Sequence, residues 1–95
     1  MVNVRRLVVD LLKPHDPDVV VFAESVAGCE GVAGVNAVLL ETDKEVQNLK
    51  LTIEGESIPV DTIHETVEDL GGTIHSIDEV VCGEHIVEES KTPQD

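Results

Sequence analysis

Two apolar segments joined by a short acidic turn constrain the fold of this chain more than any other feature. They occupy Gly31–Gly55. Residues Gln47 to Glu54 alternate strictly between apolar and polar side chains, which is typical of a β-strand with one covered face. Gly31 to Thr42 predicts the preceding strand, and the acidic triplet 43–45 supplies the turn. The stretch therefore predicts a β-hairpin, and the apolar residues that point inward from its second strand are Leu49, Leu51 and Ile53.

The first strand is predicted at Val2 to Lys13, because this segment is dense in valine and leucine. Its apolar residues lie on both faces, a pattern typical of a central strand covered on both sides. Arg6 and Asp10 interrupt the even-numbered face. Pro14 is expected to end the strand, because proline cannot donate a ladder hydrogen bond.

A helix is predicted directly after this strand. Asp16 is expected as the N-cap, Pro17 as the first helical residue, and Asp18 as a favourable charge at the positive helix end. The helix is expected to run to about Ala27. Gly28 is then the expected C-cap.

A second helix is predicted after the hairpin, entered at Ser57 or Ile58, with Pro59 near its first turn. Gly71-Gly72 is expected to end it. The apolar residues of this segment recur at helical spacing and form a single stripe. They are Val60, Ile63, Val67 and Leu70.

The last strand is predicted from Thr73 to at least Cys82. Its apolar residues do not alternate strictly, which predicts a bulge or an edge position. The resulting order, βαββαβ, predicts an α+β ferredoxin-like sandwich: a four-stranded antiparallel sheet with both helices on one face. The first and third strands are central. We assign residues 1–85 to this domain and residues 86–95 to a polar C-terminal tail.

Charge excludes several classes of partner. The 95 residues include 20 acidic and 6 basic side chains, for a net charge of −14. Such a chain repels nucleic acid and anionic membranes. Phe22 is the only aromatic residue, so platforms for base stacking are absent. The charge fits solubility or adaptation to high salt, while divalent cations and a basic partner protein remain open.

The cysteines and the first residues bear on the compartment. Cys29 and Cys82 form no CxxC motif, and they fit two small apolar residues, with a disulfide left open. Met1 to Leu12 lacks the pattern of a secretory signal, and no segment reaches membrane-spanning length. We therefore expect a cytoplasmic protein with reduced thiols.

Three motifs resemble a known family. They are a GV-x-GVN run at Gly31–Asn36, an L-x-I-x-G close at Leu51–Gly55, and GG-x-IHSIDEVV at Gly71–Val81. Together they resemble an archaeal family of unknown function, domain of unknown function 211, over Val4–Gly83. The resemblance implies a ferredoxin-like fold, an archaeal source and assembly into closed rings of several subunits. It implies no activity and no catalytic residues.

Acidic side chains at the predicted hairpin tip are candidate cation ligands. Glu41, Asp43 and Glu45 recur at every second position, so in extended chain they point the same way. Carboxylate oxygens are the ligands that Ca²⁺ and Mg²⁺ prefer. Asp78 and Glu79 could add to such a site where subunits meet. The alternative is a solvated tip whose charges protect the sheet edge.

A second candidate is a polar pair on the face of the sheet that the helices leave open. In the predicted sheet Asp10 lies beside the start of the last strand, within reach of His75, Ser76 or Asp78. The pair could be a structural ion pair, part of a subunit contact or a ligand site, and an enzyme using Asp10 and His75 is a further possibility. No metal-site spacing occurs among the four histidines, which are His15, His64, His75 and His85.

These observations favour a homo-oligomeric, ring-forming module that is structural, regulatory or ligand-binding rather than catalytic. The open face of the predicted sheet mixes apolar and charged side chains, a composition that suits a subunit interface. The alternative function is binding of a divalent cation, Ca²⁺ or Mg²⁺, or of a small ligand at subunit contacts. No other cofactor is expected.

Overall fold

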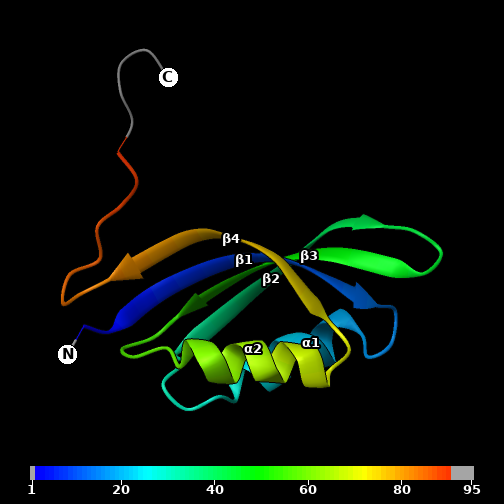
Figure 1. Ribbon diagram of the computed structural model, residues 1–95, viewed down its shortest axis with the longest axis horizontal. Helices are drawn as coiled ribbons and strands as arrows, with labels where there is room; N and C mark the ends of the chain where they lie inside the picture. The colour runs from blue at the N-terminus through cyan, green and yellow to red at the C-terminus, as the bar shows by residue number, and fades with distance from the viewer. Residues whose placement is uncertain (1, 91–95) are drawn as a thin grey trace.

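The computed structural model describes residues 2–90 and has the predicted order of strands and helices (Figure 1). Its elements are β1 Val4–Pro14, α1 Val19–Ala27, β2 Gly34–Thr42, β3 Val46–Glu54, α2 Val60–Asp69 and β4 Thr73–Cys82.

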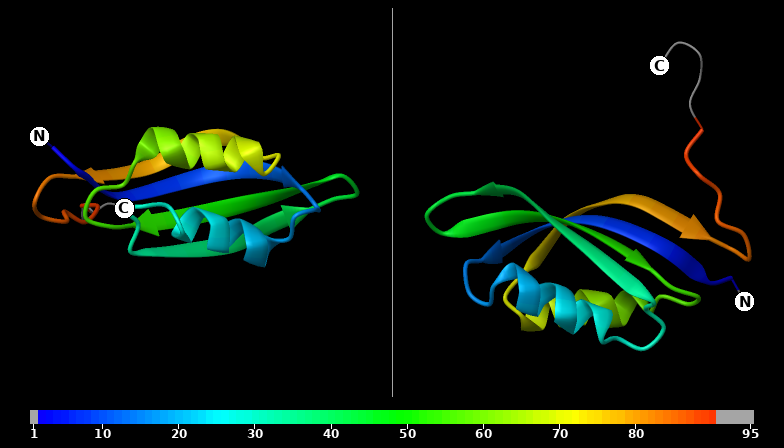
Figure 2. Two further views of the ribbon diagram at one scale, coloured as in Figure 1. Left: turned by 90° about the horizontal axis from the view of Figure 1, so that it is seen from below. Right: turned by 180° about the vertical axis from the view of Figure 1, so that it is seen from behind.

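The four strands form one antiparallel sheet in the order β2-β3-β1-β4. β1 and β3 are therefore central, and β2 and β4 are the edges. Both helices lie against the same face of the sheet, as the two views of Figure 2 show. The α+β ferredoxin-like fold predicted from the sequence is confirmed.

The core lies between the helices and the covered face of the sheet. Odd-numbered residues of β1 and β3 point into it, because side chains alternate along a strand. The two helices contribute two fully buried residues each, Phe22 and Val26 from α1 and Ile63 and Val67 from α2. The strand residues of this core are Leu7, Val9, Leu11, Leu49, Leu51 and Ile53.

Four strand boundaries differ from the predicted ones, and the smallest difference is at β3, which begins at Val46 rather than Gln47. β1 begins at Val4 rather than Val2, and it includes Pro14, which pairs with Val46. Pro14 lies beyond Leu12, the last β1 residue paired with β4, so β1 has one neighbour there and tolerates a missing N–H. β2 begins at Gly34 rather than Gly31, because Gly31 turns the chain with a φ of 95°.

The start of α1 was also predicted wrongly. Asp18, not Asp16, is the N-cap: its backbone is extended, and its carboxylate accepts a hydrogen bond of 2.9 Å from the Val21 amide. Pro17 consequently precedes the helix. Gly28 is the C-cap, as predicted. Within residues 2–90, no helix is long and apolar enough to cross a membrane.

β4 carries the predicted irregularity and is also an edge strand. Its register against β1 shifts three times: between Val4 and Arg6, where the extra residue is on β1, and between Val8 and Val9 and between Asp10 and Leu11, where the extra residue is on β4. The extra β4 residues at these slips are Asp78 and His75. A bulge re-aims the side chain it carries, so two of the candidate site residues are placed by the irregularities of β4.

The start and the end of the hairpin come close together at positions where only glycine fits. A Cβ on Gly55 would overlap the carbonyl oxygen of Gly31, and a Cβ on Gly31 would overlap the carbonyl oxygen of Ser57. The chain therefore passes close to itself where β2 begins and β3 ends. Arg5 adds to this closure, because its Nε donates to the Gly55 carbonyl at 3.2 Å.

Lys13 is a buried lysine at one end of the core. Its side chain continues the inward face of β1 and is 1% exposed. The ammonium group donates to the Pro14 carbonyl at 2.6 Å and to Gln47 Oε1 at 2.8 Å, and it lies 6.0 Å from the centroid of the Phe22 ring. Burial lowers the pKa of Lys13, while the nearby Asp18 carboxylate opposes part of this shift.

Gly55→Ala should destabilise the fold by about 1–3 kcal/mol, because the new methyl group has no room beside Gly31. The matched control is Gly34→Ala, whose methyl group meets no atom within 4 Å. The control should be neutral or slightly stabilising. Urea denaturation of both variants checks this, and equal losses in the two would contradict the close approach.

Lys13→Met should change how stability depends on pH. Since the folded pKa of Lys13 lies below the ordinary value of 10.5, the unfolded chain binds more protons between the two values. Raising the pH through this window therefore stabilises the wild type relative to Lys13→Met.

The measurement is the free energy of unfolding at pH 7 and at pH 10. Lys50→Met, which removes an exposed lysine from β3, controls for the loss of positive charge. A difference between wild type and Lys13→Met that is the same at both pH values would refute the burial of the ammonium group.

Candidate functional site

The face of the sheet opposite the helices carries most of the candidate residues. It is built from the even-numbered residues of β1 and β3 and from the β2 and β4 residues paired with them. Among these, Val8 is 7% exposed and Leu12 38%. Charged groups interrupt the apolar ones, as the sequence predicts. We call this surface the open face.

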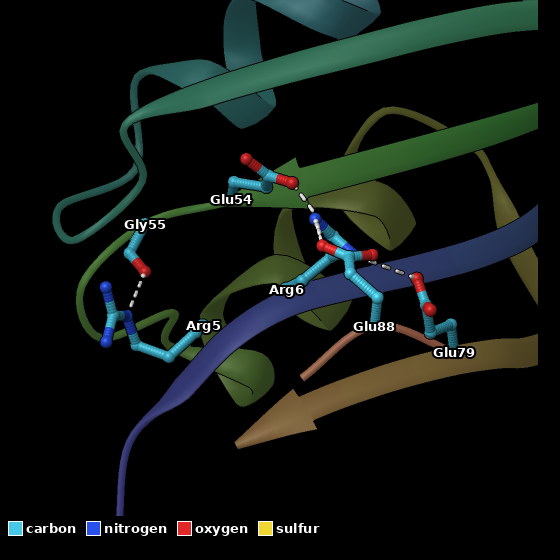
Figure 3. Close-up of polar contacts among 6 residues, drawn as sticks. All are labelled: Arg5, Arg6, Glu54, Gly55, Glu79 and Glu88. Carbon is cyan, nitrogen blue, oxygen red and sulfur yellow. Dashed lines mark hydrogen bonds and ion pairs between the residues drawn. The ribbon is translucent and has the colours of Figure 1, made fainter. Parts of the chain in front are cut away.

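Arg6 is the centre of an ion-pair cluster at one end of the open face (Figure 3). Its Nε lies 2.6 Å from Glu54 Oε2 on β3, and its Nη1 lies 3.7 Å from Glu79 on β4. Nη1 and Nη2 donate to the two carboxylate oxygens of Glu88, at 2.9 and 3.2 Å. One guanidinium group therefore joins β1, β3, β4 and the segment after β4.

This cluster shifts two pKa values. The hydrogen bonds that Arg6 donates to Glu88 and Glu54 raise the pKa of Arg6 above its ordinary value. The same contact with Arg6 lowers the pKa of the Glu88 carboxyl group. Both groups therefore remain charged at neutral pH, and the contact is an ion pair rather than a neutral hydrogen bond.

Arg5, the preceding residue, points away from Arg6 and donates hydrogen bonds to loops instead of pairing with carboxylates. Figure 3 shows it reaching the loop after β3. Besides Gly55, its guanidinium group donates from Nη1 to the carbonyls of Gly83 and Glu84, at 3.3 and 2.8 Å. Arg5 thus ties together the loops that follow β3 and β4.

At the other end of the open face, beside the hairpin tip, lies a hollow of about 310 Å³. We call it the tip hollow. Asn48 and Asp10 form a bonded pair in its lining: the amide of Asn48 donates to the Asp10 carboxylate and to the Leu11 carbonyl. The full lining is Asp10, Leu12, Glu41, Thr42, Asp43, Val46, Asn48 and His75.

The turn next to the tip hollow is held by Asp43. Its carboxylate accepts hydrogen bonds from the amides of Val46 at 2.8 Å and Glu45 at 2.9 Å. These bonds stabilise the charged form, so they lower the pKa of Asp43. His15 donates from Nε2 to the Asp43 carbonyl at 2.6 Å, which connects the loop before α1 to the tip.

The structure brings some of the predicted cation ligands together and separates others. Glu41 and Asp43 both line the tip hollow, and Glu45 is absent from its lining. Asp78 and Glu79 line a different hollow, beside Lys50. Within residues 2–90, no three His, Cys, Asp or Glu side chains are placed to hold a metal ion. A cation site completed at a subunit contact stays a prediction.

The predicted polar pair shares the tip hollow without a direct bond. Asp10 lies opposite Ser76 in the sheet register, and its carboxylate is bonded by Asn48. The His75 side chain lines the same hollow. Ser76 instead donates to Asp78, at 2.8 Å. This grouping of carboxylates, an amide and an imidazole over apolar side chains suits binding of a small cationic group.

Sequence reasoning did not find the Arg6–Glu88 contact. Arg6 and Glu54 were both placed on the open face, because their positions follow from strand alternation. Glu88 lies 82 positions from Arg6 in a segment without periodicity. The one signal available was an arginine on a largely apolar strand, which needs an acidic partner.

Comparisons with known proteins agree with the resemblance noted in the sequence. The model of the family called domain of unknown function 211, described as "Uncharacterized ArCR", matches residues 5–95. The chain is also 50% identical over 95 residues to "Uncharacterized protein MJ0319" of Methanocaldococcus jannaschii. That match covers 100% of this chain and 98% of the relative.

Proposed function

Because this chain belongs to the archaeal family of unknown function called domain of unknown function 211, we propose a role that its own surfaces support. The protein is a non-catalytic module that works as a closed ring of its own copies. The contacts between copies are made by the edge strand β2 and the adjoining open face.

The observation that carries this proposal is the apolar character of β2. Val38, Leu39 and Leu40 are consecutive, and they are 44%, 44% and 47% exposed. The register of β2 against β3 slips between Leu39 and Glu41, which places Leu40 at the irregularity. Monomeric proteins usually protect a sheet edge with charged residues or proline. An edge with three successive exposed apolar side chains is suited to contact with another chain.

The open face supports the same role. Leu12 and Val46 are exposed apolar residues on it, at 38% each. Lys50 places a positive charge on the open face, and the Arg6 cluster has three carboxylates for one guanidinium group, so a second copy can meet opposite charges there. Polar and charged groups around an apolar centre are the usual composition of an interface between folded subunits.

The net charge of −14 makes copies of the chain repel one another. Salt screens charges on the surface over about 8–10 Å at physiological ionic strength. Assembly should therefore strengthen as salt rises.

We place the protein in the cytoplasm, since Cys29 and Cys82 are both free thiols, as expected in a reducing compartment.

Leu40→Glu should weaken assembly, because it puts a charge at the centre of the proposed contact. Val20→Glu is the matched control: Val20 is 64% exposed, but it lies on the helix α1 rather than on an edge strand. Light scattering at micromolar concentration should give a multiple of the 10.2 kDa chain mass for wild type and control. Leu40→Glu should give a smaller mass.

Two results would count against the proposed assembly. The first is a wild-type mass equal to one chain in both low and molar salt. The second is equal loss of assembly in Leu40→Glu and Val20→Glu, which would move the contact away from β2.

A second candidate function is binding of a divalent cation or small ligand at the subunit contacts. The tip hollow favours it, because Glu41, Asp43 and Asp10 line one concave site next to the proposed interface. Carboxylate oxygens are the ligands that Ca²⁺ and Mg²⁺ prefer, but within residues 2–90 these three are not placed to hold an ion by themselves. A neighbouring copy would supply the remaining ligands.

Calorimetry with Ca²⁺, Mg²⁺ and Mn²⁺ tests this candidate. We expect binding heat and a raised melting temperature with at least one of these cations. Glu41→Gln should abolish both effects, while the control Glu65→Gln, on the exposed side of α2, should keep them. No heat and no thermal shift at millimolar cation would remove the candidate.

A further inference from the structure

We propose that residues 84–90 form a displaceable strap over the Arg6 end of the open face, and that this strap holds back self-association. The strap is fastened by the Arg6–Glu88 contact and is released when a second copy takes its place. The inference rests on the proposed function, because it concerns the regulation of the same interface.

The root of the strap is fixed and turned by the end of β4. Gly83 has a φ of 108°, a conformation that favours glycine, and its amide donates to the Asn3 carbonyl at 2.9 Å. Arg5 holds the carbonyls of Gly83 and Glu84. In Figure 1 the segment leaves β4 on the side of the sheet opposite the helices. The strap therefore starts from a defined point and runs on the side of the open face.

Beyond this root, Glu88 fastens the strap. It is 70% exposed, and both of its oxygens accept from Arg6. Within residues 2–90, no other side chain after Glu84 makes a hydrogen bond or ion pair. The strap is thus fastened by a single bidentate contact, between Glu88 and Arg6.

The strap packs only partly onto the sheet. Ile86 and Val87 remain 42% and 71% exposed. A hollow of about 560 Å³ lies between the strap and the open face, lined by Val87 and Glu89 on one side and by β1, β3 and β4 residues on the other. Its sheet residues include Val8, Lys50 and Val81. Val87 therefore adds little apolar contact that would oppose lifting of the strap, whereas Ile86 is more than half covered.

Release of Glu88 leaves Arg6 with partners, since Glu54 and Glu79 still flank it. The ion pair with Glu88 therefore contributes to closure as one exposed pair, which shifts the opening equilibrium by about fivefold at most. A contact that closes the interface in most molecules lowers the apparent affinity by the fraction that is open. The strap should therefore weaken assembly by a few-fold without preventing it.

The test compares Glu88→Gln with Glu89→Gln in the full chain. Both substitutions remove one negative charge from the strap, but Glu89 has no ion pair in the described residues. Glu88→Gln should tighten assembly by about two- to fivefold in sedimentation equilibrium. It should also speed hydrogen exchange of the amides in 84–90. Glu89→Gln should match the wild type in both measurements.

Each other outcome overturns the strap. Assembly of Glu88→Gln that equals or is weaker than that of Glu89→Gln shows that the segment does not restrain the interface. Unchanged hydrogen exchange in 84–90 shows that Glu88 does not fasten it. If wild type and both variants stay single chains at every concentration, the proposed assembly fails together with the strap; if they assemble equally, the strap fails alone.

Discussion

A four-stranded sheet with helices on one face has to leave its other face without a third layer, and the rest of this molecule depends on that constraint. The covered face takes the odd-numbered residues of β1 and β3, and it buries them fully against α1 and α2. Strand alternation then sends the even-numbered residues outward. Everything that distinguishes this chain, from the Arg6 cluster to the tip hollow and the strap, lies on the open face or at its rim.

Basic residues are scarce, and three of them make structural contacts within the described residues. The chain has six, against 20 acidic residues. Arg5 donates hydrogen bonds to backbone carbonyls, and Arg6 forms ion pairs with three glutamates. Lys13 is buried and donates to two oxygen atoms. The two adjacent arginines thus hold the same end of the molecule from opposite sides of β1. Acidic groups elsewhere face solvent and contribute to repulsion between copies, which the interface has to overcome.

Much of the fold followed from the sequence because its pattern is local. Alternation in β3, the stripe of α2 and the glycines after each helix were sufficient to place six elements and to name the central strands. The start of α1 did not follow, because Asp16 and Asp18 are both competent caps and the path of the preceding loop decides between them. Lys13 lies two positions after Leu11 and therefore points to the same buried face of β1. Its burial was not predicted, because a charged side chain is usually exposed.

The candidate site was predicted in part for a related reason. Glu41, Asp43, Asp10 and His75 were identified as separate groups, and the structure gathers them around one hollow. Their convergence depends on the bulge at His75 and on the turn that Asp43 holds, which are features of register rather than of composition. The Arg6–Glu88 contact joins the two ends of the chain, and no periodic pattern reports a contact of that kind.

The central claim is that another copy of the chain covers β2 and the open face beside it. Hydrogen exchange of wild-type protein, measured as a function of protein concentration, tests it most directly. We expect the β2 amides that do not bond to β3 to be protected at high concentration and to exchange faster on dilution. Exchange of those amides at one rate across all concentrations, including those at which the protein assembles, would contradict it.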